Sequence, residues 1–292
     1  MSSYISSPSK TAEILNKYGI RLKKSLGQNF LIDANIAKKI VKTAEIKSGD
    51  AVLEIGSGIG TLTEMLLHSG SNSGSSSDIK IVCIEFDRLL VKVFKDTFKP
   101  ESSEKLFLIE ADALKLDYSE ISRKYSINEV VSNLPYKIAA PLLIKILLKA
   151  PQVKNYYVTI QKDIADRMLA RVGDKNYSSY TVKANFLADF KIYFTISRNC
   201  FIPKPYVDSV FLGITRKENI EIPEDFFNFI DACFQHRRKK LINSLADSGI
   251  NKYVDKIDLT IRMLSDIGKG KNTRAEELNP EDYLFLYKNI FL

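Results

Sequence analysis

The feature that most constrains the fold is an apolar run that ends in three alternate glycines. Residues 51–55 read Ala-Val-Leu-Glu-Ile, a pattern typical of a short buried strand. Gly56, Gly58 and Gly60 follow, and a helical pattern over residues 61–67 comes directly after them. Glycines at such a turn allow positive φ and let a nucleotide-like ligand approach the backbone closely. The spacing is not the G-x-G-x-x-G fingerprint, so no pyrophosphate is expected, and a tight structural turn is the alternative.

Strands and helices alternate beyond this turn. Short apolar runs predict strands, and apolar residues at helical spacing predict helices. Their alternation predicts an α/β fold with a doubly wound, Rossmann-like parallel sheet. The predicted strands are residues 51–55, 79–84, 106–109, 130–133 and 156–160, and the predicted helices are residues 33–44, 61–67, 86–98 and 141–149.

Polar residues stand at the ends of three successive strands, where doubly wound sheets bind ligands. Glu85 ends the second strand, Asp112 follows the third and Asn133 follows the fourth. Glu85 comes 29 residues after Gly56, but the spacing becomes 19 without the ten-residue Ser/Gly-rich insertion Ser69–Asp78, which reads as a flexible surface loop. A ribose-binding acid is expected at roughly 20 residues. Each acid alone fits a surface carboxylate, but the series favours a nucleoside-like ligand.

The loop Asn133-Leu134-Pro135-Tyr136 has residue types suited to an exocyclic amine. An Asn oxygen and a backbone carbonyl can accept the two amine hydrogens and favour the reactive geometry. Pro135 fixes its own φ and biases Leu134 to an extended conformation, so that the Leu134 carbonyl can be aimed. Tyr136 offers a flat face for a flipped base. A proline turn after a buried strand explains the same residues, and the tetrapeptide alone does not decide.

The charge distribution favours an anionic partner. The formal net charge is +8, and residues 1–46 carry eight Lys/Arg against three Asp/Glu. Residues 216–292 carry thirteen of each kind, with four basic residues in a row at 237–240. Alternatively, the basic residues of both segments, 1–46 and 237–240, belong to ordinary solvent-exposed faces that bind no partner. Residues 23–31 could close over a ligand and contact a phosphate backbone, or they could form the ordinary segment that leads into the next helix. The residue types alone do not decide between these alternatives.

Cysteine and histidine usage limits the remaining chemistry. Cys83, Cys200 and Cys233 are too few and too widely spaced for a disulfide framework, which favours a reducing compartment. His68 and His236 are the only histidines, so we expect neither a metal site nor a Ser-His-Asp triad. No apolar run reaches ~18 residues, and the first residues lack a secretory signal core. We therefore expect a cytoplasmic protein.

A chain of 292 residues can hold one large domain or a large and a small one, and the change of character after about residue 215 favours two. Residues 1–20 are predicted to form a flexible N-terminal arm, residues 21–215 the Rossmann-like domain and residues 216–292 a small all-α domain. Within the last, residues 226–245 predict one amphipathic helix that presents the basic residues 237–240 to a partner.

Together these motifs resemble the ribosomal RNA adenine dimethyltransferase family, the type that confers kasugamycin sensitivity. The resemblance implies a class I methyltransferase with S-adenosylmethionine as methyl donor. It implies dimethylation of N6 on two adjacent adenosines near the 3′ end of small-subunit rRNA, and a role in small-subunit biogenesis. It spans residues 21 to 285, and the matching segments are Leu26–Leu31, Glu54–Gly60, Glu85, Asp112-Ala113, Asn133–Tyr136, Gln161–Asp163, Phe201–Ser209 and Arg237–Lys240.

The resemblance also implies roles for individual residues. Those expected to bind the donor or line its pocket are Asn29, Leu31, Gly56, Gly58, Glu85, Asp112 and Asn133. Those expected to hold the target adenine are Asn133, Leu134, Pro135, Tyr136 and, on the other face of the base, Phe201. Those expected to contact RNA are Lys23, Lys24, Arg237, Arg238, Lys239 and Lys240. The insertion, Lys137 and Tyr206 depart from the family pattern and affect loop contacts to RNA.

Three other functions fit parts of the pattern. One is the antibiotic-resistance class that dimethylates large-subunit rRNA, but Val207-Asp208-Ser209 and the long C-terminal segment favour the small-subunit class. A DNA-associated mitochondrial transcription factor is disfavoured by the intact donor and catalytic motifs. An RNA-binding assembly factor with dispensable catalysis fits the sequence as well as an enzyme does. The expected partner is small-subunit rRNA or a precursor of that subunit, and the expected state is a monomer, with a nucleolar or organellar location open for a eukaryote.

Overall fold

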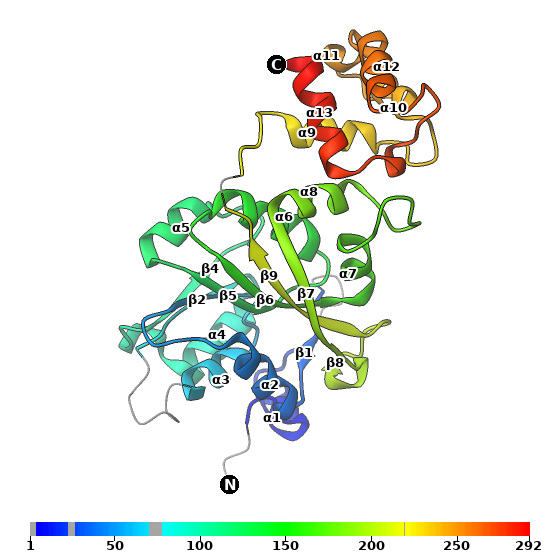
Figure 1. Ribbon diagram of the computed structural model, residues 1–292. Coiled ribbons are helices and arrows are strands. Elements are labelled where there is room, and N and C mark those ends of the chain that lie inside the picture. The colour runs from blue at the N-terminus through cyan, green and yellow to red at the C-terminus, as the bar shows by residue number, and fades with distance from the viewer. Residues whose placement is uncertain (1–3, 23–26, 70–77, 219) are drawn as a thin grey trace. The chain divides into compact units, whose positions relative to one another are not determined.

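The computed structural model describes residues 4–22, 27–69, 78–218 and 220–292 (Figure 1). The chain forms two compact units. The first comprises residues 1–164 and 189–216, and the second comprises residues 165–188 and 217–292. The structure differs from the predicted domains over residues 165–188, because Tyr177 and Val182 are buried in the apolar core of the second unit.

A seven-stranded sheet forms the centre of the first unit, and its strand order is β4-β3-β2-β5-β6-β9-β7. The pairs from β4 to β6 are parallel, which confirms the predicted α/β class, while β9 runs antiparallel to β6 and makes the sheet mixed. The strands are β2 (Ala51–Ile55), β3 (Lys80–Glu85), β4 (Leu106–Glu110), β5 (Glu129–Asn133), β6 (Asn155–Gln161), β7 (Ala188–Ile196) and β9 (Ser209–Arg216).

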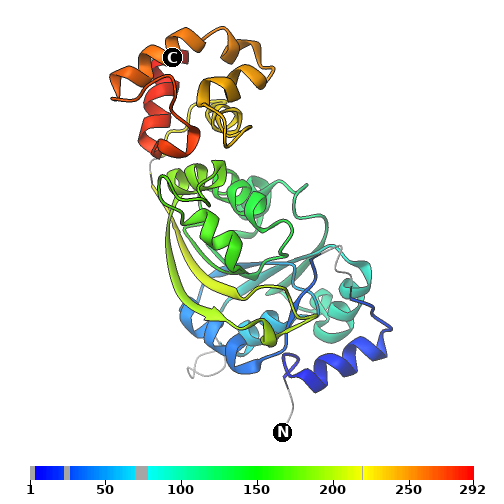
Figure 2. The same cartoon turned by 90° about the vertical axis from the view of Figure 1, so that its right-hand side faces the viewer.

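Helices cover both faces of this sheet (Figures 1 and 2). One face carries α2 (Ala34–Ala44), α3 (Thr61–Ser69) and α4 (Arg88–Phe98), and the other carries α5 (Tyr118–Tyr125) and α6 (Ala139–Lys149). Asp33 and Asp87 cap α2 and α4, because each carboxylate accepts hydrogen bonds from backbone N–H groups of the first turn. The predicted helices at 33–44, 61–67, 86–98 and 141–149 all form, with shifted ends.

The N-terminal segment differs from the predicted flexible arm. Residues 8–17 form helix α1 (Pro8–Lys17), with Ser7 as its N-cap. Ile14 and Leu15 are buried in one apolar cluster with Phe30 and Leu90. Burial of these apolar side chains stabilises this segment.

The second unit is all-α over the residues that the structure describes. Its apolar core is built largely from aromatic and aliphatic side chains such as Phe226, Phe229 and Tyr283. Its helices are α8 (Ser179–Leu187), α9 (Phe226–Cys233), α10 (Leu241–Asp247), α11 (Asn251–Val254), α12 (Ile257–Asp266) and α13 (Pro280–Phe291), while α7 (Lys162–Met168) spans the boundary between the units.

The predicted helix over residues 226–245 is wrong in its middle. α9 ends at Cys233 and α10 begins at Leu241, so the basic residues 237–240 lie in the turn between them. Lys240 forms a β-bridge with Arg274, and the Leu241 N–H donates to the Thr273 carbonyl at 2.8 Å. These pairings hold the backbone in a non-helical conformation. In the described ranges, no helix has both the length and the apolar character needed to cross a membrane.

Candidate active site

A pocket of about 280 Å³ lies at the carboxyl ends of β2, β3 and β5. The strand order reverses between β2 and β5, and ligands bind at such switch points of α/β sheets. All of the predicted donor and target residues within the described ranges line this pocket, except Phe201: Asn29, Leu31, Gly56, Gly58, Glu85, Asp112, Asn133, Leu134, Pro135 and Tyr136.

The glycine-rich turn packs directly against two other parts of the site. Gly56 has φ +73°, and a Cβ atom there would lie 2.8 Å from Cγ of Pro135. Gly58 has φ +59°, and a Cβ atom there would lie 2.8 Å from Cε1 of Phe30. A side chain at either position would therefore push the Asn-Leu-Pro-Tyr loop or β1 (Phe30–Leu31) out of place, besides adopting a backbone conformation that favours glycine.

Glu85 is fixed at the tip of β3 by three backbone N–H groups. Its Oε2 accepts from the Gly58 N–H, and its Oε1 accepts from the N–H groups of Phe86 and Asp87, all at 2.8 Å. Burial raises the pKa of this carboxyl group, and the three hydrogen bonds oppose that shift. The Oε2 atom accepts only one of these hydrogen bonds, so it has a further lone pair that can accept a hydroxyl hydrogen from a ligand in the pocket.

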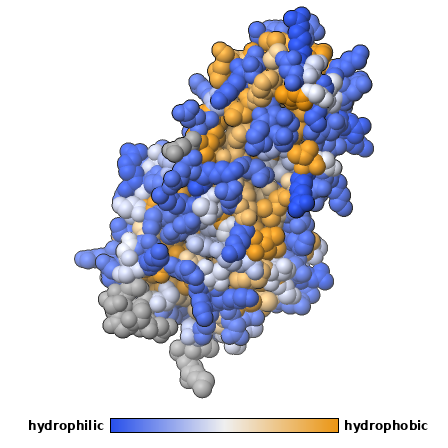
Figure 3. Space-filling view, viewed as in Figure 1, coloured by the Kyte–Doolittle hydropathy of each residue, from blue (hydrophilic) through white to orange (hydrophobic). Residues whose placement is uncertain are grey.

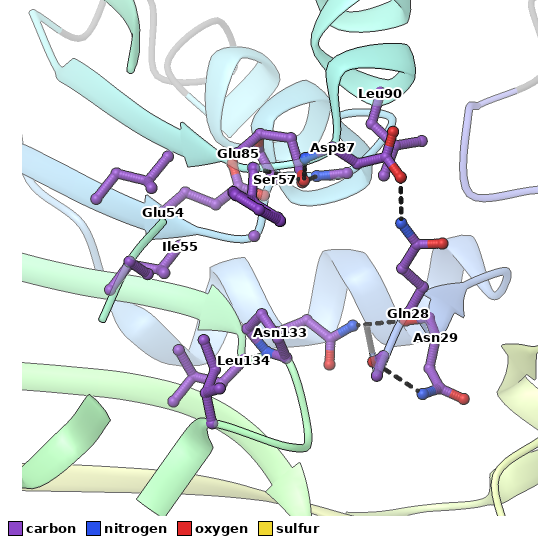
Figure 4. Close-up of a pocket in the computed structure, with 18 of the residues that line it drawn as sticks. Gln28, Asn29, Glu54, Ile55, Ser57, Glu85, Asp87, Leu90, Asn133 and Leu134 are labelled. Atoms are coloured by element: carbon purple, nitrogen blue, oxygen red, sulfur yellow. Dashed lines mark hydrogen bonds between the residues drawn. The ribbon is translucent and has the colours of Figure 1, made fainter. Parts of the chain in front are cut away.

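Asn133 has one used and one unused polar atom (Figure 4). Its Nδ2 donates to the Asn29 backbone carbonyl at 3.0 Å, which fixes the amide plane. Its Oδ1 is buried and has no hydrogen-bond partner among the described residues. A buried polar atom left without a partner costs about 1–3 kcal/mol. The side chain is therefore arranged to accept a hydrogen bond from a ligand.

Two further pocket hydroxyls are in the same state and were not predicted as site residues. Ser57 Oγ and Thr61 Oγ1 are buried, line the pocket and lack a hydrogen-bond partner within the described ranges. Ser57 lies between two glycines of the turn, and that position was the signal in the sequence. Together with Asn133 Oδ1, these two hydroxyl oxygens give the pocket three polar atoms without a hydrogen-bond partner among the described residues, next to the glycine-rich turn. The two hydroxyl groups fit a polar, nucleoside-like molecule such as S-adenosylmethionine, and Asn133 Oδ1 is a third acceptor in the same pocket.

Tyr136 and Phe201 contact each other instead of facing across a gap. Their ring centroids are 6.3 Å apart, and the rings are inclined by 68°. Phe201 lies in β8 (Phe201–Ile202), opposite Leu31 of β1. The Tyr136 hydroxyl shares a 2.7 Å hydrogen bond with Ser209 Oγ, and burial raises its pKa to about 12, so the ring is a neutral phenol. A base between the two rings requires one ring to turn, although Tyr136 is held by the hydrogen bond to Ser209 and Phe201 by its place in the sheet core.

The structure describes the predicted donor-binding residue Asp112, but it does not describe the predicted RNA contacts of the N-terminal segment. Asp112 lines the pocket, and its Oδ1 accepts from the Leu114 N–H at 3.0 Å. Lys23, Lys24 and residues 70–77 of the insertion lie outside the described residues. Within the described part of the chain, no group of three or more His, Cys, Asp or Glu side chains is placed to hold a metal ion.

Glu54 is a buried carboxyl group on the pocket wall. Its Oε2 accepts from the Thr63 hydroxyl at 2.5 Å and lies 3.7 Å from Cys83 Sγ. Burial raises the pKa of Glu54 to about 8, because the carboxylate form would lose its hydration. Glu54 is therefore mainly a neutral, protonated group at pH 7.

We expect Glu54→Gln to stabilise the protein at alkaline pH. The pKa of Glu54 is about 8 in the folded protein, against an ordinary value of 4.5. The stability that the protonated form contributes is thus present below pH 4.5 and is lost as the pH rises through 8. Glutamine keeps the neutral shape, so the variant should match the parent in acid and exceed it at pH 8 by on the order of 1 kcal/mol or more. Chemical denaturation across a pH series measures this difference, and parallel curves would contradict the buried, protonated state.

Comparisons with known proteins point to one family. A sequence model described as Ribosomal RNA adenine dimethylase matches residues 19–289. The Ribosomal RNA small subunit methyltransferase A of Bacillus mycoides is 34% identical over 99% of this chain and 98% of its own. The crystal structure of a dimethyladenosine transferase from Plasmodium falciparum is 28% identical, covers 88% of this chain and 97% of its own, and has a TM-score of 0.69. The 23S rRNA methyltransferase ErmE, at 22% identity and a TM-score of 0.57, shares the fold over 90% of this chain and 100% of its own.

Proposed function

The chain belongs to the ribosomal RNA adenine dimethylase family, and we propose that it dimethylates N6 of two adjacent adenosines near the 3′ end of small-subunit rRNA. The family match confirms the resemblance inferred from the motifs. Relatives named for the small subunit, similar over nearly the full length, favour that subunit over the large one. We also propose that the partner is the small subunit or its precursor and that the enzyme acts as a monomer.

The observation that carries this proposal is the unused Oδ1 of Asn133. The lone pair of an adenine amine is delocalised into the ring, so the amine is a poor nucleophile until its hydrogens are held out of that geometry. Asn133 Oδ1 can accept one hydrogen, and the Leu134 carbonyl, which accepts no hydrogen bond from the described residues, can accept the other. Both acceptors are preorganised, by the Asn29 carbonyl and by Pro135 respectively, and they stabilise the positive charge that develops on nitrogen.

The donor half of the pocket would be held by the residues around β2 and β3. Glu85 would accept hydrogen bonds from the ribose hydroxyl groups, and Asp112 would accept one from the adenine amino group. The hydroxyl groups of Ser57 and Thr61 would form hydrogen bonds with polar atoms of the same ligand. S-adenosylmethionine, when bound, supplies an electrophilic methyl group on a sulfonium. Nitrogen–carbon bond formation and carbon–sulfur bond cleavage are then a single in-line displacement, after which the amine proton can leave to water. Positioning by these residues would be the main source of catalysis.

Methyl transfer to undermethylated small subunits tests this function directly. Labelled S-adenosylmethionine is incubated with subunits isolated from a strain that lacks the activity, and the labelled nucleotides are mapped. Label on N6 of two adjacent adenosines near the 3′ end is the expected result. Label confined to large-subunit rRNA would support the resistance class, and binding without any label would support an assembly factor.

The basic turn 237–240 is expected to bind RNA through two of its four residues. Arg237 pairs with Glu276 at 3.0 Å and Lys239 with Asp247 at 2.9 Å, so their charges are partly neutralised within the second unit. Arg238 and Lys240 are exposed. Replacing these two by Gln should weaken subunit binding and flatten the dependence of log affinity on log salt by about 1.4, which is the contribution of two phosphate contacts to single-stranded RNA.

A matched control keeps the same change in charge on the same unit. Lys256 and Arg262 are also exposed, and their replacement by Gln should leave the salt dependence unchanged. Binding isotherms over a salt series compare the two double variants with the parent. Identical slopes for all three proteins would show that the turn is only a solvated face.

A further inference from the structure

Helix α2 and strand β7 present four exposed lysines on the first unit. Three of them, Lys38, Lys39 and Lys42, lie on α2, which has no acidic residue between its first and last positions. The fourth, Lys191, lies on β7. We call these four side chains and the rings under them the α2–β7 surface. Figure 3 views the first unit from the side of α2 and β7, where hydrophilic and apolar side chains are interspersed.

Aromatic rings, and not carboxylates, are the neighbours of three of these lysines, Lys38, Lys39 and Lys191. The Nζ atom of Lys39 lies 4.0 Å from the centre of the Phe194 ring, and that of Lys191 lies 4.8 Å from the Tyr193 ring. Lys38 lies 4.1 Å from the Tyr4 ring in the same way. Within the described residues, none of the four lysines has a carboxylate oxygen within 4.0 Å, the limit for an ion pair. A ring face attracts a cation without neutralising it, so the positive charge stays available to a partner.

The rings are themselves fixed by the core, which holds Lys38, Lys39 and Lys191 in place. Phe194 packs against Phe211 with ring centres 5.1 Å apart, and Tyr193 stacks on Tyr157 at 6.4 Å. Phe211 is fully buried in the sheet core, and the other three rings pack against the same cluster. A lysine confined over a fixed ring loses less side-chain entropy when it binds a phosphate than a freely rotating lysine does.

The surface begins next to the pocket. Leu31 lines the pocket, Asp33 caps α2, and the Ile32 N–H donates to the Cys200 carbonyl beside Phe201. With a rise of about 1.5 Å per residue, Lys38 and Lys42 lie roughly 6 and 12 Å along the helix from its first residue. Charges on the same rigid unit and at this range can act on the backbone of a nucleic acid whose base enters the pocket.

We propose that the α2–β7 surface binds the phosphate backbone of rRNA next to the target adenosines. The inference rests on the proposed function, because that function brings a polyanion to this unit. Four cations without acidic partners, spread over two elements, match a chain of phosphates. The surface acts on affinity and orientation of the RNA and takes no part in methyl transfer.

The test is a quadruple variant with Lys38, Lys39, Lys42 and Lys191 replaced by Gln. Binding is measured over a salt series to undermethylated small subunits and to a naked fragment of the rRNA 3′ end that carries the target adenosines. Loss of four contacts should flatten the dependence of log affinity on log salt by about 3. Between about 50 and about 200 mM salt, the parent should then lose roughly 50 times more affinity than the variant. The KM for RNA should rise, while kcat at saturation and donor affinity stay unchanged.

Two further proteins separate this role from a general effect of charge. Arginine at the four positions keeps the phosphate contacts and should restore the parental slope. Gln at Lys92, Lys99, Lys124 and Lys149, which are exposed on or beside α4, α5 and α6, removes the same charge elsewhere and should leave the parental slope nearly intact.

The outcomes separate the surface from the proposed function. In one outcome the parent protein transfers methyl groups, and the binding isotherms of the quadruple variant superimpose on those of the parent or of the control variant. That outcome overturns the RNA-binding role of the α2–β7 surface and leaves the proposed function standing. A parent whose RNA binding depends on the surface but which transfers no methyl group overturns the proposed function alone. A change confined to whole subunits and absent from the naked fragment would mean that the surface meets a ribosomal protein, which also overturns the proposal.

Discussion

Replacing Asn133 by Ala should lower methyl-transfer turnover by roughly 100-fold or more, the usual cost of removing one preorganised polar group from a transition state. The Oδ1 atom of Asn133 is buried and unpaired in the pocket, so its contribution is made to the attacking amine. Donor affinity should change little, because the fixed carboxylate and the glycine-rich turn lie on the other strands. Single-turnover rates on undermethylated subunits, with donor affinity from calorimetry, measure both quantities.

Asn128→Ala is the matched control for this variant. Asn128 immediately precedes β5, and Asn133 ends the same strand. Truncation of Asn128 also removes partly buried hydrogen bonds. Its Oδ1 accepts from the Ala51 N–H at 2.8 Å, and its Nδ2 donates to Asp50 at 2.7 Å. The control should cost stability but not turnover. Near-normal turnover in the Asn133 variant, or an equal loss in both variants, would remove Asn133 from the reaction.

Replacing Glu85 by Ala or Gln should weaken donor binding by on the order of tenfold or more, since each hydrogen bond to a charged group contributes roughly 1.5–3 kcal/mol. The structure makes Gln the more informative of the two. Ala would leave the N–H groups of Gly58, Phe86 and Asp87 without their acceptor, and the fold would suffer. Gln keeps one acceptor oxygen, so a loss of donor affinity in that variant reports on the ligand. Calorimetry with S-adenosylhomocysteine, alongside thermal unfolding, separates the two effects.

Glu110→Gln is the control for charge at the same edge of the sheet. Glu110 is the register partner of Glu85 on β4, and it lies outside the pocket in a 3.6 Å ion pair with Arg88. Its replacement should leave donor affinity within about twofold, because exposed ion pairs contribute little. A folded Glu85→Gln variant with parental affinity would exclude the ribose contact.

The parts of the site that could be predicted from sequence are those that depend on local order along the chain. An apolar strand followed by a polar residue puts that residue at one edge of a parallel sheet, which is why Glu85, Asp112 and Asn133 share a pocket. The contacts that close the site depend on distant segments. The Gly58 N–H meets Glu85, and the Asn133 amide meets the Asn29 carbonyl more than a hundred residues away. No pattern in either segment encodes that pairing.

The larger misses have the same origin. Residues 226–245 have helical periodicity throughout, yet a backbone pairing with residues 273 and 274 interrupts the helix at the basic turn. The N-terminal arm was expected to be loose because Ser and Pro residues come early in it. Only the three-dimensional neighbourhood of Ile14 and Leu15, which includes Phe30 and Leu90 of the pocket wall, supplies the burial that orders it.

The second unit is assembled from two separate stretches of chain, and this has a consequence for synthesis on the ribosome. Tyr177 is buried in that unit, and its hydroxyl donates to the Leu278 carbonyl at 2.8 Å. A ribosome adding roughly 5–20 residues each second needs about 5–20 s to travel from the one residue to the other. During that interval β9 can complete the sheet of the first unit, while residues 165–188 wait with their apolar side chains uncovered. The apolar side chains of residues 165–188 are therefore covered only after the C-terminal residues have been synthesised. Premature termination of translation would release a protein with a complete sheet and an exposed apolar segment.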